Sequence, residues 1–590
     1  MERLRGNLPL LLIWLAVCAV LILVTRGQIA TGIGWDPDDQ LRMVQLRDWL
    51  GGQSWFDTTQ YRIGEPDSQP MHWPRWIELP LAVVVLALAP VFGAAAAETA
   101  AMVIVPLVTL GLAMWLVMKI SGTVFDRTIA ILAAALTATA VPIVAQIRPM
   151  RVDHHGWQIV LALTALWTMY WPEKRKAGIA LGAALALWLS ISLEGLPLSA
   201  AFIVLLVWRW VVQTEEGVRL FWTLSSFLIA SFLLYLGSQG GFDAAINYCD
   251  ALSPAHLLAC TVGAAVMLPA IKFLPANIIF RLASLVIAGT AALAVLYSLA
   301  PQCIGGAFNT MDPIVRDYWL VNVLEGLPIW YQNGKTMVTL FGGSIIVGLG
   351  SLIYIIWVRP IEVDRGKLFV LGYAFLWALV LSVFIQRATA VAAAFALPFM
   401  AWAVHQAFVR ARAVQRPPLR IIATAAVVLL IMPGPLAIAL FNNVSGEESP
   451  NEAKTANLSC RNDDSLARLN GLPRSNILAP FDFGPRILLL TPHGVLATSH
   501  HRNDQAMADQ IRIFASAPDV ARALLEEHEI RYIIACAGEA ELALYAKKHP
   551  GGLWGQLARD RKPGWLQSVH LRDSRLDVWR VTSKELRNAM

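Results

Sequence analysis

Charged residues are unusually few in this sequence. Only 15% of its 590 residues are Asp, Glu, Lys or Arg, whereas soluble domains carry about 25%. Hydrophobic residues make up 57% of the chain, and the mean hydropathy is +0.56. The composition therefore excludes a wholly soluble protein and places most of the chain in lipid.

Cysteine motifs, internal repeats and low-complexity stretches are also missing. The six cysteines show no CxxC pair and no zinc-ligand spacing. Cys460 and Cys536 both lie in the polar C-terminal region and are available to pair if that region is extracytoplasmic, which the sequence leaves open. The net charge of +6 does not indicate nucleic acid, because the basic residues cluster in short loops between apolar runs.

The apolar runs predict a multi-pass membrane protein. Residues 8–25 have the shape of a signal peptide, but no small-residue cleavage site follows, so we expect an uncleaved first span. About 13 runs approach the roughly 20 residues that a span needs. With the N-terminus inside, the predicted inside loops are the ones that carry Lys and Arg, as the positive-inside rule requires: 119–127, 173–176, 214–219, the loop around Lys272, 359–367 and 410–420.

One apolar run, residues 79–92, does not fit as a span. Counting it would invert every later loop, and it is short and flanked by Pro80 and Pro90. We therefore predict a re-entrant or interfacial helix within the first external loop.

This arrangement divides the chain into a transmembrane region, residues 1–442, and an extracytoplasmic region, residues 443–590. Large external loops are expected at 28–97, 147–156 and 301–335, with a further external piece at 238–256. In the C-terminal region, residues 477–479, 486–490 and 531–535 are typical of short buried strands, and 520–527 of a helix. That alternation predicts a small α/β domain.

The first external loop opens on three carboxylates in four residues, Asp36, Asp38 and Asp39, with Pro37 between them. Such a group suits a metal ion or acid–base chemistry. The alternative is a helix start, because Asp followed by Pro is a common cap and acids are favoured in a first turn. Both interpretations can hold for different residues.

Asp153, His154 and His155 lie between two long apolar runs. Asp and His are good ligands for a divalent metal, and ionisable groups are costly at a membrane border. The alternative is an ordinary solvent-exposed polar loop between two helices.

Three further positions have both a binding and a structural interpretation. Residues 71–75, which include His72 and Arg75, are aromatic and basic and suit a headgroup or phosphate, or else pack at the interface. Glu325 is a carboxylate among apolar residues in an external loop. Arg387, at the external mouth of a span, either snorkels or binds an anionic headgroup.

Taken together, these motifs resemble the catalytic subunit of oligosaccharyltransferase, a GT-C type membrane glycosyltransferase. Their shared order along nearly the whole chain carries the resemblance. The matching stretches are Asp36-Pro37 and Arg42 for Asp-Pro-Tyr-Phe-Asn-Tyr-Arg, Asp153-His154-His155 for the Asp-His-His form of the second motif, Val323-Leu324-Glu325 for Ser-Val-Ser-Glu, Arg387 with Phe395-Ala396-Leu397-Pro398 for the Arg-led span, and Pro480-Phe481-Asp482-Phe483-Gly484 for Trp-Trp-Asp-Tyr-Gly.

The resemblance implies a metal-dependent site. Asp36, Asp153 and His155 would hold a divalent cation, Mg²⁺ or Mn²⁺, beside the donor phosphate, with Asp36 also counted as catalytic. Glu325 would contact the metal or the acceptor from a mobile loop. His154 is expected to matter least of its triplet.

Substrate residues follow in the same way. Arg387 would pair with the polyprenyl phosphate, and we add His72 and Arg75 as headgroup ligands. Asp482 and Phe481 would contact the acceptor. In the family, paired tryptophans recognise the hydroxyl residue of an Asn-x-Ser/Thr acceptor. Here Pro480 and Phe481 replace those tryptophans, so the acceptor pocket is expected to differ.

The predicted function is transfer of a sugar or glycan from a polyprenyl-(pyro)phosphate donor to an extracytoplasmic acceptor, at a bacterial inner membrane. Protein Asn is one acceptor; a lipid, polysaccharide or protein hydroxyl is the other. A transporter or lipid flippase fits the spans equally well, but those proteins place ionisable groups near the midplane and often show repeated halves. A catalytically dead scaffold is the third alternative.

Overall fold

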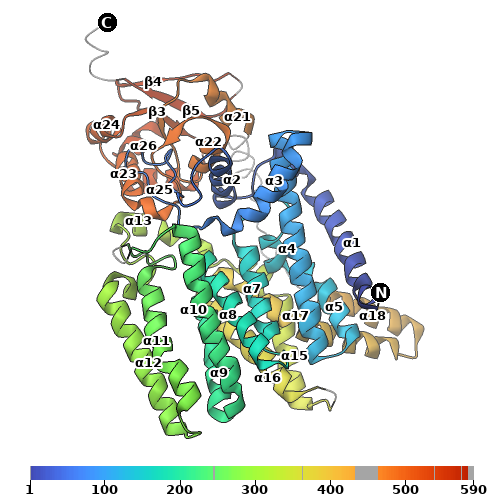
Figure 1. Cartoon of the computed structure of the whole chain (residues 1–590). Coiled ribbons are helices and arrows are strands. Elements are labelled where there is room, and N and C mark those ends of the chain that lie inside the picture. The colour runs from blue at the N-terminus through green and yellow to red at the C-terminus, as the bar shows by residue number, and fades with distance from the viewer. Residues whose placement is uncertain are drawn as a thin grey trace. The chain divides into compact units, whose positions relative to one another are not determined.

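A computed structural model describes residues 2–243, 246–361, 363–431, 463–536, 538–572 and 574–582. It separates into two compact units (Figure 1). The helical unit comprises residues 1–29, 73–310 and 323–446, and the mixed unit comprises 30–72, 311–322 and 447–590. The domain boundary predicted at 442/443 lies outside the described residues.

The helical unit is built of helices joined by short loops. Its helices are α1 (Glu2–Thr31), α3 (Leu79–Phe92), α4 (Ala94–Val124), α5 (Arg127–Thr137), α6 (Val141–Gln146), α7 (His155–Thr168), α8 (Lys174–Ile191), α9 (Leu196–Val212), α10 (Gly217–Gln239), α11 (Pro254–Phe273), α12 (Ile278–Leu299), α14 (Gly334–Phe341), α15 (Ser344–Val358), α16 (Arg365–Phe384), α17 (Thr389–Arg412) and α18 (Pro417–Ile431).

Eight helices of the described residues are long and apolar enough to cross a membrane. A ninth span results if α14 and α15, which meet at a 53° bend, are counted as one. The multi-pass prediction is confirmed, but the count of 13 is not. Several expected spans are shorter helices, such as α5 with 11 residues. The 79–92 segment is α3, a 14-residue apolar helix packed against α4, and its re-entrant or interfacial position stays a prediction.

Helix α17 forms the centre of this unit. Its first half is rich in alanine, and Ala392, Ala393 and Ala396 are completely buried. Small side chains let neighbouring helices approach closely. At Gly348 of α15, an added Cβ would lie 2.8 Å from the Cβ of Ala396, so these two helices meet backbone to backbone.

A disulfide joins Cys249, between α10 and α11, to Cys303, just after α12. The sequence analysis did not predict this pair. Both cysteines lie in predicted external pieces, 238–256 and 301–335. Because disulfides form in oxidising compartments, this shared external position could have indicated the pair.

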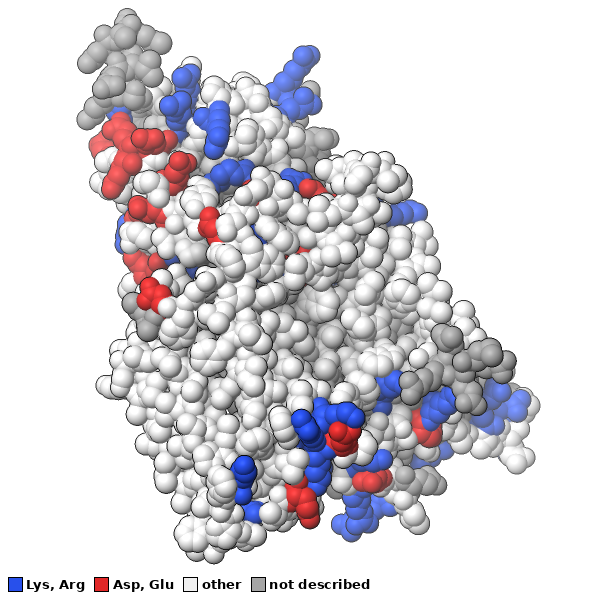
Figure 2. Space-filling view, in the orientation of Figure 1, with Lys and Arg blue, Asp and Glu red and all other residues white. Residues whose placement is uncertain are grey.

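Charged side chains are unevenly distributed over the helical unit. Figure 2 shows a broad uncharged surface with Lys and Arg gathered at one end of the helices. Lys174 and Arg209, at the start of α8 and the end of α9, both approach Glu216 there, at 3.3 and 4.0 Å. An uncharged band ending in basic residues is typical of a membrane protein.

The mixed unit contains a five-stranded sheet in the order β2-β1-β3-β5-β4. Strand β1 is parallel to both β2 and β3, whereas β5 is antiparallel to β3 and β4. The strands are β1 (Asn476–Leu478), β2 (Gly494–Val495), β3 (Ile530–Ala535), β4 (Leu566–Ser568) and β5 (Asp577–Val581), and the accompanying helices include α22 (Gly484–Leu490), α23 (Asp504–Ala515), α24 (Pro518–Glu527), α25 (Ala540–Lys548) and α26 (Leu553–Leu557).

The predicted strands near 477 and 531 and the predicted helix near 520 are confirmed. The predicted strand at 486–490 is wrong, because these residues belong to helix α22. A short apolar run fits a buried helix as well as a strand. Pro485 in the first turn of α22 favours the helix.

Two distant segments complete the mixed unit. Helix α2 (Pro37–Leu50) packs against α22, where Arg47 Nη1 donates to the Leu489 carbonyl over 2.6 Å. Helix α13 (Pro313–Tyr318) follows Asp312, whose Oδ2 lies 3.0 Å from Arg512 Nη2 on α23. The start of the first predicted external loop and part of the third thus belong to the same fold as the C-terminal sheet. The possible Cys460–Cys536 pair involves residue 460, which lies outside the described residues.

Candidate active site

The Asp-His-His triplet is buried in the short connection from α6 to α7. The side chains of Asp153, His154 and His155 are 1%, 6% and 7% exposed. Asp153 Oδ1 accepts from the His154 backbone N–H at 2.7 Å and lies 2.6 Å from His154 Nδ1. Arg151 Nη2 is 3.8 Å from Asp153 Oδ2. The loop is therefore a packed cluster of buried ionisable groups. The alternative of an ordinary solvent-exposed loop is excluded.

The close contact with His154 keeps Asp153 ionised. Burial raises the pKa of the Asp153 carboxyl, but the neighbouring His154, His155 and Arg151 together hold that pKa well below its usual value. Burial likewise lowers the pKa of His154, and the Asp153 charge raises it to about 9. At neutral pH the pair is thus an imidazolium bound to a carboxylate.

The two carboxylate oxygens of Asp153 have different neighbours, and this arrangement suits a metal ion. With Oδ1 engaged by His154, Asp153 presents Oδ2, and His155 Nε2 lies 3.2 Å from it. His155 Nε2 is buried and makes no hydrogen bond within the described part of the chain. Ligand atoms of the three residues lie within 4.8 Å of one another. An oxygen and a nitrogen ligand at this spacing suit a divalent cation, with His154 orienting the carboxylate.

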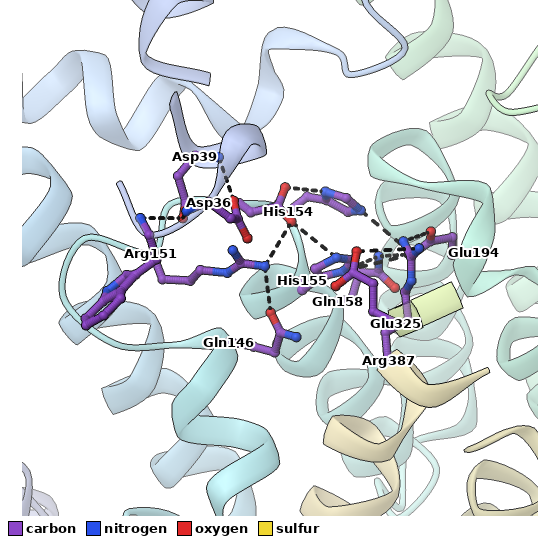
Figure 3. A network of polar contacts seen from close by, with 12 residues as sticks. Asp36, Asp39, Gln146, Arg151, His154, His155, Gln158, Glu194, Glu325 and Arg387 are labelled. Atoms are coloured by element: carbon purple, nitrogen blue, oxygen red, sulfur yellow. Dashed lines mark hydrogen bonds and ion pairs between the residues drawn. The ribbon is translucent and has the colours of Figure 1, made fainter. Parts of the chain in front are cut away.

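Glu194 lies beside the triplet and was missed by the sequence analysis. It belongs to the 3₁₀ turn Leu193–Gly195, in the break between α8 and α9. Its Oε2 lies 3.8 Å from His154 Nε2 and 3.9 Å from His155 Nδ1 (Figure 3). Its Oε1 accepts from Nη1 of Arg387.

Arg387 lies between two carboxylates, Glu194 and Glu325 (Figure 3). Its Nη2 is 3.6 Å from Glu325 Oε1. The turn Leu324–Gly326 that carries Glu325 is tied to the arginine's own turn, because the Gln386 N–H donates to the Leu327 carbonyl. In this structure Glu325 therefore contacts the predicted phosphate ligand, and its predicted contact with metal or acceptor stays a prediction.

Exposure rises across this cluster. Asp153 is 1% exposed, Arg387 is 18%, and Glu325 and Glu194 are 37% and 39%. The cluster thus has a buried end suited to an ion and an open end lined by a guanidinium and two carboxylates.

A second candidate site, a pocket, lies within the mixed unit. It is lined by Trp35, Asp36, Pro37, Gln40, Asp482, Phe483 and Arg486. Asp36 caps α2, its Oδ1 accepting the Asp39 N–H at 3.0 Å, so the helix-start interpretation holds for that oxygen. The same residue lines the pocket together with Asp482. The start of the first loop and the Pro-Phe-Asp-Phe-Gly stretch are therefore brought together.

Phe481 does not line this pocket. Its side chain is 3% exposed and lies in the core, while its backbone N–H donates to Glu541 Oε2 at 2.8 Å. Burial raises the pKa of Glu541 to about 8; the Phe481 bond opposes this, and the charge of Asp482 adds to it. Glu541 is thus held protonated at neutral pH beneath the turn that presents Asp482.

The remaining predicted residues lie elsewhere. His72, in the mixed unit, has its ring 4.4 Å from that of His501 and stacked at 6.0 Å on that of His500. Arg75, in the helical unit, is 1% exposed, and its Nη1 lies 3.2 Å from Glu78 Oε2. Phosphate binding by both residues stays a prediction.

Asp36 belongs to the mixed unit and Asp153 with His155 to the helical unit. A metal site that joins all three therefore also stays a prediction.

Comparison with known proteins supports the fold. No family model and no curated protein matches the sequence. Among solved structures, the archaeal oligosaccharyltransferase AglB from Archaeoglobus fulgidus, in complex with an inhibitory peptide and a dolichol-phosphate, is similar with a TM-score of 0.65 at 15% identity, over 97% of this chain and 74% of that one. The same protein in complex with Zn and sulfate gives a TM-score of 0.56 at 14% identity, over 92% and 69%. The resemblance to the oligosaccharyltransferase catalytic subunit is thus confirmed at the level of the fold.

Proposed function

We propose that this protein is a metal-dependent membrane glycosyltransferase that transfers a sugar or glycan from a polyprenyl-(pyro)phosphate donor to an extracytoplasmic acceptor. The observation that carries the proposal is the cluster of Asp153, His155 and Arg387 in one unit, where Glu194 lies between a candidate cation site and a guanidinium. A cation beside a guanidinium suits the phosphate of such a donor.

In the proposed reaction, a nucleophile of the acceptor attacks the anomeric carbon as the bond to the phosphate oxygen breaks, and the lipid (pyro)phosphate departs. A bound Mg²⁺ or Mn²⁺ would stabilise the charge that develops on this leaving group. Asp153 and His155 would hold the ion, with Asp36 as the third ligand. Arg387, His72 and Arg75 would hold the phosphate. Glu325 and Asp36 would act at the reacting centre.

The disulfide supports the extracytoplasmic side. In the proposed topology each helix from α7 to α12 crosses the membrane, so alternation puts the start of α7, the α8–α9 break, Cys249 and Cys303 on one face. Disulfides form in oxidising compartments. On this basis the triplet and Glu194 face the outside; in a bacterium this is the outer face of the inner membrane.

The acceptor is the least constrained partner. Asp482 lines the mixed-unit pocket, and Pro480 and Phe481 stand where the family has tryptophans. The A. fulgidus enzyme has been crystallised tethered to an acceptor peptide with an Asn-Val-Thr sequon, at 14% identity and a TM-score of 0.62 to this chain. We propose two acceptor classes, protein Asn, and the hydroxyl of a lipid, polysaccharide or protein.

The test is transfer from purified polyprenyl-linked donors by the full-length protein in lipid nanodiscs, with Mn²⁺ and with chelator. We expect Mn²⁺-dependent transfer that the D153A variant loses. The matched control is E173Q, which removes an exposed carboxylate paired only with Lys176 in the described residues. Metal-independent transfer, or full activity of D153A, would contradict the proposal.

A further inference from the structure

Glu194, which no sequence motif identifies, contacts several residues of the candidate site. It comes from the α8–α9 break, yet it reaches His154 and His155 at the start of α7 and Arg387 at the start of α17. Gln158, one turn into α7, donates to Glu194 Oε2 at 3.2 Å. One carboxylate thus links three parts of the helical unit.

Its two oxygens have different partners. Oε1 accepts from Arg387 Nη1, while Oε2 faces Gln158 and the two imidazoles. The guanidinium is planar and rigid, so fixing one of its terminal nitrogens fixes the direction of the other. Here the other nitrogen, Nη2, points toward the open end, where Glu325 Oε1 lies 3.6 Å away.

We propose that Glu194 is a positioning residue for the donor phosphate, which holds Arg387 by Nη1 so that Nη2 is presented to the phosphate beside the Asp153–His155 ion site. The inference rests on the proposed function and adds a residue outside the motifs that led to it. Glu194 acts through Arg387 and touches neither donor nor acceptor.

The contacts distinguish Glu194 from Glu325. Glu194 is anchored by Arg387, by Gln158 and by its two imidazole neighbours, whereas Glu325 meets Arg387 at 3.6 Å from a 3₁₀ turn. A phosphate arriving at Nη2 therefore replaces Glu325 and leaves Glu194 in place. The released Glu325 turn is then available to the acceptor side of the reaction.

Replacing Glu194 by Gln has two opposing effects on phosphate binding. It removes a negative charge near an incoming anion, which favours binding. It also releases Nη1, so that Arg387 turns fully toward Glu325, which occupies the phosphate's place. A directed charge-assisted contact is strong only in the correct geometry, so we expect the second effect to prevail.

The experiment measures binding of undecaprenyl phosphate to the full-length protein in nanodiscs, for the wild type, E194Q, R387Q and the double variant. We expect E194Q to weaken binding about tenfold and to raise the donor KM more than it lowers kcat. In the R387Q background the same change should have no further effect, because a residue that acts through Arg387 adds nothing once the arginine is gone. E194D, which keeps the charge, should recover part of the affinity, and E173Q should match the wild type.

Three results would overturn the inference. E194Q binding the lipid phosphate as well as or better than the wild type would show that charge prevails over position. An equal loss in the wild-type and R387Q backgrounds would show that Glu194 acts independently of the arginine. An effect of both E194Q and E194D on thermal unfolding alone, with binding unchanged, would assign Glu194 to structure. No lipid-phosphate binding by the wild type would instead overturn the proposed function, and this inference with it.

Discussion

Two buried carboxyl groups, Asp153 in the helical unit and Glu541 in the mixed unit, lie in opposite surroundings. In the helical unit, Asp153 and Glu194 lie against imidazoles and Arg387. In the mixed unit, Glu541 lies beneath Asp482 and accepts bonds from a backbone N–H, an amide and the Tyr545 hydroxyl. Paired with bases, a buried carboxyl stays ionised; without them it keeps its proton. The first arrangement is equipped for an ion and a phosphate, and the second supports a turn.

Removing the Arg387 guanidinium is expected to have the largest effect on the site of the helical unit. R387Q leaves two carboxylates, Glu194 and Glu325, facing each other without the cation between them. We expect the donor kcat/KM to fall by about a hundredfold, because a charge-assisted contact is lost and the remaining acids repel an anion. Steady-state transfer at varied donor concentration measures this loss of kcat/KM. R387K should recover only part of the activity, since the lysine ammonium cannot contact Glu194 and the phosphate at once in the forked geometry of a guanidinium. Unchanged donor kinetics in R387Q would remove Arg387 from the site.

The stability of the mixed unit is expected to fall when Phe481, the buried aromatic residue of the turn before α22, is substituted. F481A deletes a ring that is 3% exposed and should lower the free energy of unfolding of this unit by about 3 kcal/mol or more. F481L, which keeps most of the apolar volume, should cost much less. Limited proteolysis and thermal unfolding measure both. If F481A instead left stability intact and changed only acceptor KM, Phe481 would be an acceptor ligand, as the sequence motif implies.

Glu541 gives the mixed unit a pH-dependent stability. The folded pKa, about 8, exceeds the ordinary value of 4.5, so the folded state keeps a proton that the unfolded state releases. Stability is therefore fully present below about pH 4.5 and falls as pH rises toward 8. E541Q should unfold at a higher temperature than the wild type at pH 8 and show little gain at pH 5. Parallel profiles for the two proteins would mean that Glu541 is ionised.

The smallest effect is expected at Asp482, which lines the pocket and is exposed. D482N should leave the free energy of unfolding within about 0.5 kcal/mol of the wild type and raise the acceptor KM a few-fold, with donor KM constant. A matched D519N variant, on an exposed helix start, should change neither. An effect of D482N on donor KM alone would assign the pocket to the donor.

Much of this could be predicted from the sequence, for identifiable reasons. The multi-pass fold follows from composition, and the strands near 477 and 531 from their apolar residues. Asp153 and His155 were found because ionisable groups at a membrane border are costly. The same argument applied to Glu194, between two apolar runs, would have found it as well.

What the sequence could not show depends on the third dimension. The approach of Glu194 to Arg387 joins residues 193 positions apart, and nothing local marks it. Helix α22 was mistaken for a strand because the short run 486–490, with four apolar residues in succession after Arg486, has no clear period. The burial of Phe481, whose backbone N–H donates to Glu541, likewise depends on tertiary packing that its motif does not reveal.

The proposed function depends on a divalent cation that Asp153 and His155 hold and that serves transfer. Its most direct test is a Mn²⁺ titration of the full-length protein followed by electron paramagnetic resonance, for the wild type, H155A and H154A. We predict one Mn²⁺ bound by the wild type, no measurable binding by H155A, and binding about 10–100-fold weaker by H154A, whose ring orients Asp153 without presenting a ligand. Equal Mn²⁺ affinity in the wild type and H155A would contradict the claim.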